Sequence, residues 1–363
     1  MARPRRGRWL ARAAATTFLT APLFSGIIPH VPLEAHHERS LPIAGQALPL
    51  PCFFPSVSSV KANQRPAEYV EFLVALREPQ LLISAYDFHK AAPADRRRMA
   101  RSLNRATEQG TAILLDSGNY EGFWHGDRSW KLASFLRELR RVPFHMAFAF
   151  DDQAPPTQSM SAVAAIEKMV LKAQKTMGEA GGGTVVPIVH GTPTVLAKRA
   201  AMVAERLQPI MLAVPERSLG AGLLARAHTV RAIRVAIDKV APSCVLHLLG
   251  TGNPLSLLVL SMAGAQSFDG LEWCRTCADP DTARLYHFQQ RSLVGRTDQD
   301  DLVSSISSRS YEQATLVHNL LFFRSWMARI RQALAEGKAD EMVRQCVASD
   351  RADCVLEALY GEP

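Results

Sequence analysis

The chain has 363 residues, of which 47% are hydrophobic and 21% charged, as in ordinary globular proteins. Its net charge of +8 falls to +3 when five arginines within residues 3–12 are set aside, so the remainder permits a polyanionic partner without requiring one. Beyond the N-terminal region no run of 18 or more apolar residues occurs, which excludes a membrane span there, and no membrane partner is expected.

Residues 1–45 are predicted to form a basic and then apolar extension that is not part of the fold. The five arginines precede an apolar stretch over residues 13–28, which Pro22 interrupts. This composition fits a twin-arginine, secretory or transit-like segment, or a stretch without a structural role, and we assign it no cellular address.

The six cysteines are scattered along the chain, at positions 52, 244, 274, 277, 346 and 354. That distribution excludes a disulfide framework and suits a reducing compartment, so we expect a cytoplasmic protein. Cys274 and Cys277 form a C-x-x-C motif without a second one elsewhere. We interpret them as two incidental thiols, with a metal half-site or a redox pair as the alternative.

From residue 50 onward, short aliphatic or β-branched runs alternate with longer segments of helical period. Most of the runs are continuously apolar, as in strands that are covered on both faces. We predict eight strands, at residues 53–58, 81–86, 112–116, 145–151, 184–190, 210–215, 245–250 and 265–269.

Helices are predicted in the gaps between these strands. The first two open on a proline, whose missing N–H costs nothing in a first helical turn. The segments are 66–76, 93–109, 129–141, 161–178, 194–207, 222–240 and 254–263. Eight strands alternating with helices predict an α/β fold, a (β/α)8 TIM-type barrel over residues 46–340, with a doubly wound open sheet as the alternative.

The chain after residue 269 is predicted to leave the barrel pattern. A polar, irregular stretch runs to about residue 309. Residues 311–337 then read as an amphipathic helix that covers the barrel, with Leu316, Phe323 and Ile330 among the apolar residues on one side. Residues 341–363 are expected to add a small helical cap, so that the barrel carries a C-terminal helical extension.

Polar side chains follow nearly every predicted strand. Asp116 and Asp269 each end an apolar run beside or near a glycine. Because the active site of such a barrel lies at the carboxyl ends of its strands, we expect these side chains to share one site. Two carboxylates there suggest one nucleophile and one proton carrier. The other polar strand-end residues are Ser117, Asp151, His190, Glu216 and Thr251.

Glycines beside these acids indicate a flat ligand, because a residue without a side chain lets a ligand approach the backbone closely. They are Gly118, Gly191, Gly250, Gly252 and Gly270. Tyr120 is placed to stack on such a ligand, and Asp151 to accept two N–H bonds from the edge of a purine.

Seven short segments carry a resemblance to a known family. In chain order they read D-S-G-N-Y-E (116–121), F-A-F-D-D (148–152), I-V-H-G (188–191), A-V-P-E-R-S-L-G (213–220), L-L-G-T-G-N-P (248–254), F-D-G followed by Arg275 (268–275) and V-H-N-L (317–320). They resemble the D-S-G-G-F/Y-Q, M-A-F-D-E, I-V-Q-G, A-x-G-G-L-x-x-G, L-M-G-V-G-x-P, F-D-C-V-x-P-T-R and I-H-N-L segments of the tRNA-guanine (queuine/archaeosine) transglycosylase superfamily. The order is preserved from about residue 52 to 335.

The resemblance implies a glycosyltransferase that exchanges guanine in a polynucleotide for a 7-deazaguanine. Asp269 would attack C1′ of the target nucleotide and form a covalent glycosyl-enzyme. Asp116 would serve as general acid for the departing base and general base for the incoming one. Asp151 would recognise the pyrimidine edge of the base, assisted by Ser117 and Gly191, and Tyr120 would stack on it.

Departures from the family segments bear on the metal and the base. The family's zinc site is C-x-C-x2-C followed by a histidine, and only His318 has a counterpart here, so we expect no structural zinc, no metal ligand and no cofactor. His190 replaces the family's glutamine, and Pro215 with Glu216 replaces its glycine pair. With Gly250 and Arg275, these residues complete the predicted substrate-binding set.

The polynucleotide is expected to be DNA or tRNA. Residues 53–61 and 271–290 look more like the branch of the superfamily that inserts 7-deazaguanines into DNA. Two alternatives stay open: a non-catalytic nucleic-acid-binding paralogue or accessory subunit, and a barrel glycosidase with paired carboxylates and the sugar-stacking Trp124, Trp130 and Trp273. A homodimer or a partner subunit is left open as well.

Overall fold

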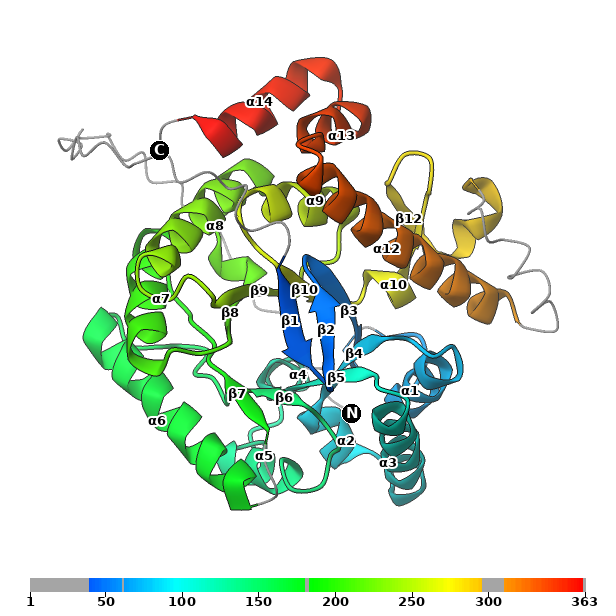
Figure 1. Cartoon of the computed structure of the whole chain (residues 1–363). Helices are drawn as coiled ribbons and strands as arrows, with labels where there is room; N and C mark the ends of the chain where they lie inside the picture. The colour runs from blue at the N-terminus through cyan, green and yellow to red at the C-terminus, as the bar shows by residue number, and fades with distance from the viewer. Residues whose placement is uncertain (1–38, 61, 180–182, 296–309, 362–363) are drawn as a thin grey trace, which may run out of the picture. The chain divides into compact units, whose positions relative to one another are not determined.

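The computed structural model describes residues 39–60, 62–179, 183–295 and 310–361, and its central element is a barrel of eight parallel strands (Figure 1). β10 pairs back onto β3, and a parallel bridge between Ile188 and Ala213 links the segment after β7 to β8. This confirms the (β/α)8 TIM-type barrel with a C-terminal helical part. In chain order the strands are β3 (Cys52–Val57), β4 (Gln80–Ser84), β5 (Ala112–Asp116), β6 (Met146–Phe148), β7 (Thr184–Val186), β8 (Met211–Pro215), β9 (Val245–Leu249) and β10 (Ser267–Gly270).

The strands are short apolar runs because both of their faces are buried. Alternate side chains such as Phe54, Leu114 and Met211 fill the barrel interior, while their neighbours pack outward against the helices. Several strands end earlier than predicted. The fourth and fifth stop at Phe148 and Val186, so the polar residues that follow are free of the sheet ladder and belong to loops.

A β hairpin, β1 (Ser40–Ile43) with β2 (Gln46–Pro49), closes one end of the barrel, where Figure 1 shows it in front of the strands. Its buried Leu41 and Leu48 join the interior side chains of the barrel. The hairpin leads directly into β3, so it covers the amino ends of the strands and leaves the carboxyl ends open. It begins inside the predicted extension of residues 1–45; residues 1–38 of that extension lie outside the described residues.

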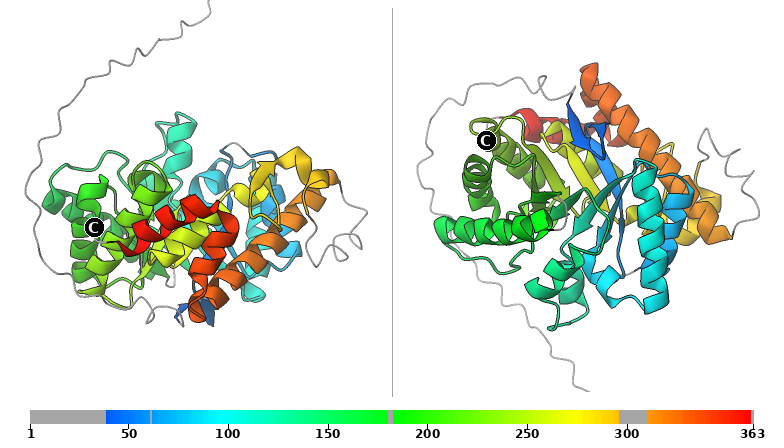
Figure 2. Two further views of the ribbon diagram at one scale, coloured as in Figure 1. Left: turned by 90° about the horizontal axis from the view of Figure 1, so that it is seen from above. Right: turned by 60° about the horizontal axis from the view of Figure 1, so that its bottom comes forward.

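Helices surround the barrel (Figure 2). They are α1 (Pro66–Ala75), α3 (Pro93–Glu108), α5 (Leu132–Glu138), α6 (Ser159–Glu179), α7 (Pro193–Leu207), α8 (Leu223–Asp238) and α9 (Pro254–Met262). Two further short helices, α2 (Ala85–Lys90) and α4 (Asn119–Trp124), follow strands directly and were not predicted. Ser84 ends β4 and caps α2 by accepting a bond from the Asp87 amide, which is why the predicted strand to residue 86 is too long.

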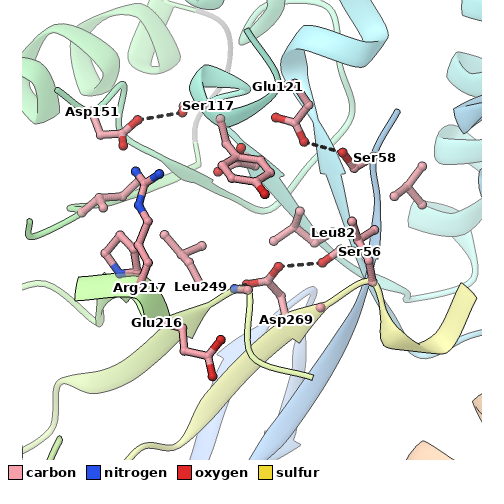
Figure 3. A pocket seen from close by; sticks show the side chains of 18 of the residues that line it. Ser56, Ser58, Leu82, Ser117, Glu121, Asp151, Glu216, Arg217, Leu249 and Asp269 are labelled. Atoms are coloured by element: carbon pink, nitrogen blue, oxygen red, sulfur yellow. Dashed lines mark hydrogen bonds between the residues drawn. The ribbon is translucent and has the colours of Figure 1, made fainter. Parts of the chain in front are cut away.

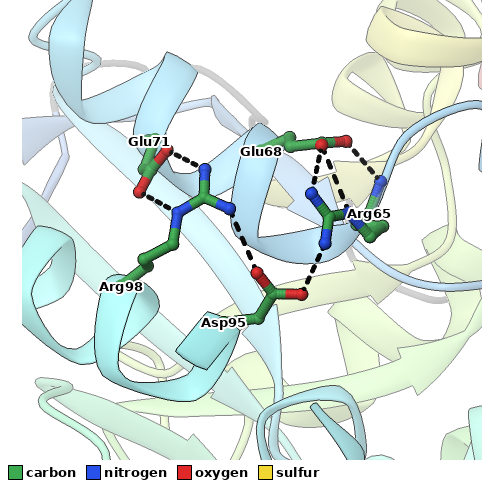
Figure 4. Close-up of polar contacts among 5 residues, drawn as sticks. All are labelled: Arg65, Glu68, Glu71, Asp95 and Arg98. Atoms are coloured by element: carbon green, nitrogen blue, oxygen red, sulfur yellow. Dashed lines mark hydrogen bonds and ion pairs between the residues drawn. The ribbon is translucent and has the colours of Figure 1, made fainter. Parts of the chain in front are cut away.

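Polar pairs on the surface also join α1 to α3 (Figure 4). The Arg98 guanidinium lies 2.5 Å from Glu71 and 3.0 Å from Asp95, and Arg65 lies 2.9 Å from Asp95 and 2.7 Å from Glu68. Exposed pairs of this kind contribute little to stability, so the buried apolar faces of the two helices supply most of their attachment.

Up to residue 295, the chain after β10 is more ordered than the irregular stretch predicted there; residues 296–309 of that stretch lie outside the described residues. It forms α10 (Glu272–Arg275), the strand pair β11 (Thr276–Ala278) and β12 (Leu285–His287), and the short helix η3 (Phe288–Leu293). The helix α12 (Tyr311–Ala335) then packs on the barrel, where Phe323 stacks on Phe53 at 4.6 Å. The predicted cap is two helices, α13 (Ala339–Cys346) and α14 (Ser349–Tyr360). Among the described residues no helix is long and apolar enough to cross a membrane.

Candidate active site

A cavity of about 310 Å³ opens at the carboxyl ends of the strands (Figure 3). Nine of the ten predicted site residues line it: Asp116, Ser117, Tyr120, Asp151, His190, Glu216, Gly250, Asp269 and Arg275. The tenth, Gly191, does not. A side chain on Gly191 would meet Val195 at 2.8 Å, so the absence of a side chain here makes room for α7.

Asp269, at the end of β10, is held by groups from the two neighbouring strands. The Ser56 hydroxyl donates to Oδ2 at 2.7 Å and the Gly250 amide donates to Oδ1 at 2.9 Å. Nε2 of His247, a fully buried residue on β9, lies 3.2 Å from Oδ1. The carboxylate is only 7% exposed and is fixed from both sides, which pre-positions its oxygens for attack on a bound ligand.

Asp116, at the end of β5, lies in a different environment within the same cavity. Burial, followed by the charges of Asp151 and Asp269, raises the pKa of its carboxyl to about 7. The Gly118 amide donates to its Oδ2 at 2.9 Å and holds the side chain against the turn. A carboxyl that titrates near neutral pH is suited both to give and to take a proton.

Gly118 shapes the turn that presents Asp116, and its backbone has a φ of +74°. An added Cβ would lie 2.5 Å from the Tyr86 nitrogen and 2.9 Å from its Cα, so backbone has to move. We therefore expect Gly118→Ala to lower the free energy of unfolding by about 2–4 kcal/mol, measured by denaturant titration.

Gly126 is the matched control, because its φ is +63° with nothing within 4 Å of the added Cβ. Gly126→Ala is expected to cost only the left-handed backbone penalty of about 1–2 kcal/mol. Equal losses in the two variants would show that the close contact with Tyr86 is not the cause.

Asp151 is the centre of a polar cluster on one side of the cavity, across from Ser56 and Ser58 in Figure 3. The Ser117 hydroxyl donates to its Oδ1 at 3.2 Å, and Nε2 of His190 lies 2.7 Å from its Oδ2. Gln153 also donates to Oδ2 and in turn accepts from Arg217. These contacts orient the carboxylate while it lines the cavity.

The sequence did not single out two further acids that line the cavity, Glu121 and Glu272. Glu121 is 4% exposed, accepts from the Ser58 hydroxyl at 2.7 Å, and its Oε2 has no partner among the described residues. Burial, then the charges of Asp87 and Asp116, raises its pKa well above the usual range. Burial, with smaller contributions from Glu216 and Asp269, raises the pKa of Glu272 to about 7.

Two glycines make room for the Glu272 carboxyl. An added Cβ at Gly252 or Gly270 would run into its Oε2. Both glycines were predicted to admit a flat ligand, and the structure instead places a protein side chain against them. Glu121 and Glu272 lie within five residues of the two aspartates, on the short helices α4 and α10 that turn back over the cavity.

Neither His318, the one counterpart of the family's zinc ligands, nor the two cysteines of the C-x-x-C motif form a site for a zinc ion. Nε2 of His318 lies 2.7 Å from the carbonyl oxygen of Ala278, and the Cys274 thiol lies 3.3 Å from that of Leu271. Burial raises the pKa of Cys274 to about 12 and that of Cys277 to about 11, so both side chains are thiols in this structure. The described part of the chain contains no group of three or more His, Cys, Asp or Glu side chains that could hold a metal.

Comparison with known proteins adds one distant relative. No family model matches the chain. The tRNA-guanine(15) transglycosylase of Methanothermobacter thermautotrophicus is 21% identical over 284 residues, which is 73% of this chain and 42% of the relative. The chain therefore spans less than half the length of this curated relative. The match supports the resemblance to the transglycosylase superfamily.

Proposed function

We propose that this chain is a transglycosylase that exchanges guanine in a polynucleotide, with DNA favoured over tRNA, for a 7-deazaguanine base. One observation carries the proposal. Two carboxyls share one cavity in unlike environments: Asp269 is fixed by donors on both oxygens, while the pKa of Asp116 is raised to about 7. That division suits a nucleophile and a proton carrier.

In the first step, an Asp269 oxygen forms a bond to C1′ of the target nucleotide as the bond from C1′ to N9 of guanine breaks. The electron pair of that bond goes to the departing base, which takes the proton of Asp116. The Ser56 and Gly250 donors hold the attacking carboxylate in place. The products are a covalent glycosyl ester on Asp269, free guanine and ionised Asp116.

In the second step, the incoming 7-deazaguanine loses its N9 proton to Asp116, and N9 bonds to C1′ as the ester to Asp269 breaks. Asp269 leaves as a carboxylate and Asp116 is protonated again, so the protein returns to its starting state. A pKa near 7 serves both directions of proton transfer at neutral pH.

Asp151 is proposed to read the base, because its carboxylate accepts from groups on the cavity wall and can accept from a base edge in the same way. Asp151→Asn replaces an acceptor by a donor, and we expect exchange to fall by roughly 10- to 100-fold, or about 1–3 kcal/mol. Initial rates at several base concentrations measure the change, which should lie in KM for the base. The adjacent, exposed Asp152→Asn is the control.

Incorporation of labelled guanine tests the proposal itself. The purified protein is incubated with labelled guanine and with either plasmid DNA or bulk tRNA. Label in DNA supports the favoured substrate, and label in tRNA alone assigns the activity to tRNA. Salt-sensitive binding without incorporation into either would contradict exchange and favour an accessory subunit, while hydrolysis of a saccharide would favour a glycosidase.

A further inference from the structure

Three aromatic side chains stand exposed on α4, the short helix that follows Asp116. Tyr120, Phe123 and Trp124 are 40%, 67% and 50% exposed. Because they are spaced three and four residues apart, they lie on one face of the helix. Tyr120 also lines the cavity and packs edge-on against Trp124 at 6.1 Å, so the aromatic face is continuous with the candidate active site.

This clustering distinguishes α4 from the other exposed apolar positions. Single exposed apolar residues are normal on a soluble protein, whereas a contiguous group marks an interaction site. The other large exposed hydrophobic side chains in the described residues are spread over several elements: Met160, Leu171, Ile210, Leu224, Tyr286, Leu293 and Tyr360. None of those elements carries three, and none combines aromatic rings with the mouth of the cavity.

The opposite side of α4 is anchored, so the aromatic face is presented by a rigid support. Glu121 is bonded to Ser58 inside the cavity wall. Gly122 packs against Trp130 so closely that an added Cβ would lie 3.1 Å from the indole, and its carbonyl accepts from the Asp127 amide at 2.8 Å. A helix held on one side and exposing three rings on the other has the form of a stacking platform.

The segment that follows α4 is basic at its surface. Arg128 and Lys131 are exposed, and Asp127, the acid between α4 and these residues, is already paired with Lys90 at 2.6 Å. Positive charge beside exposed aromatic rings is the combination that binds single-stranded nucleic acid, since the charges contact phosphates and the rings stack on bases. A purely apolar partner would not require the charges.

We infer that the aromatic face of α4 stacks on the unpaired base next to the target nucleotide. The inference rests on the proposed function, which makes a polynucleotide the substrate. Attack at C1′ requires the target nucleotide to leave its stack, and its neighbour then loses a stacking partner. Phe123 and Trp124, beside the cavity that receives the target, replace that partner and keep the strand open.

Binding of a single-stranded oligonucleotide of about 12 nucleotides, labelled with fluorescein, tests the inference by anisotropy. Phe123→Ala and Trp124→Ala are each expected to weaken binding roughly 5- to 100-fold. Trp124→Phe should keep most of the affinity, because it retains a ring. The salt dependence of binding should stay unchanged in all three variants, since counterion release depends on Arg128 and Lys131 and not on the rings.

Leu171→Ala is the matched control, because Leu171 is 60% exposed on α6, away from the cavity lining. Its variant should bind like the parent chain. Three results would each overturn the platform: parent-like binding by both aromatic variants, a loss in Leu171→Ala as large as theirs, or no binding of single strands by the parent chain.

Failure of the platform and failure of the proposed function are distinguishable because binding is measured without base exchange. If labelled guanine is exchanged while the aromatic variants bind normally, the stacking role of α4 is contradicted and the proposed base exchange is supported. If the aromatic variants lose binding while no polynucleotide is exchanged, the rings of α4 do bind single strands, but the proposed base exchange is contradicted.

Discussion

Asp269→Asn is expected to reduce guanine exchange by on the order of 10⁴-fold, as removal of a catalytic nucleophile does in other enzymes. The amide is nearly the same size as the carboxylate. Its oxygen can still accept from the Gly250 amide while its NH2 group donates to the Ser56 hydroxyl, which reverses that one bond, so the fold should persist. It is a poor nucleophile and cannot form a glycosyl ester. Incorporation of labelled guanine per unit time, compared between the two proteins at matched circular dichroism, measures the effect.

The donors around Asp269 explain why such a small change has such a large expected effect. Ser56 lies on β3 and Gly250 directly follows β9, the two strands that pair with β10, so the position of the carboxylate is set by the barrel itself. An exchange rate in Asp269→Asn equal to that of the parent protein would mean that another group attacks C1′ or that no covalent step occurs.

Asp116→Asn is expected to slow exchange by about 10²- to 10⁴-fold, because the amide neither protonates the departing guanine nor accepts the proton of the incoming base. In the parent protein the first step needs protonated Asp116, whose pKa is about 7. Its kcat/KM for the polynucleotide should therefore fall as the pH rises above about 7. The residual activity of Asp116→Asn should lack this decline. An identical decline in both proteins would contradict the role of general acid that we assign to Asp116.

Asp116→Asn, which should lower the exchange rate, is expected to raise the free energy of unfolding. The pKa of Asp116 rises from an ordinary 3.8 to about 7 on folding, so folding favours the protonated form. Its contribution to stability is fully present below about pH 4 and is lost as the pH rises toward 7. At about pH 8 Asp116→Asn should be more stable than the parent protein, on the order of 2 kcal/mol by denaturant titration, and the gain should shrink near pH 4.

The barrel strands were predictable because each is a short apolar run, and residues 112–116 were predicted without error. The strand-end aspartates were predictable for the same reason, since a polar residue that ends an apolar run lies at the sheet edge. The hairpin of residues 40–49 was missed because Pro42, Gly45 and Pro49 interrupt its alternating pattern. The hairpin is stabilised by burial of Leu41 and Leu48 against the side chains of the barrel interior, which is a tertiary contact and not a local pattern.

Glu121 and Glu272 were missed for a different reason. Each belongs to a short helix whose direction is set by tertiary contacts, such as the contact of Gly118 with Tyr86, which turns the chain into α4. A local sequence pattern carries no information about that contact. Gly191 was predicted to contact the substrate because a glycine after a strand lets a ligand approach the backbone. In the structure its missing side chain leaves room for Val195 of α7, a tertiary contact that the sequence pattern does not show.

The central claim is that Asp269 forms a covalent bond to C1′ of a nucleotide. The direct measurement is mass spectrometry of the protein after incubation with a guanine-containing polynucleotide without an incoming base, followed by rapid acid denaturation and digestion by a nuclease and a protease. The peptide that contains Asp269 should then carry the added mass of a sugar with its phosphate, and Asp269→Asn should not. Exchange of guanine without any such adduct, or with the adduct on Asp116 or Glu272, would contradict the claim.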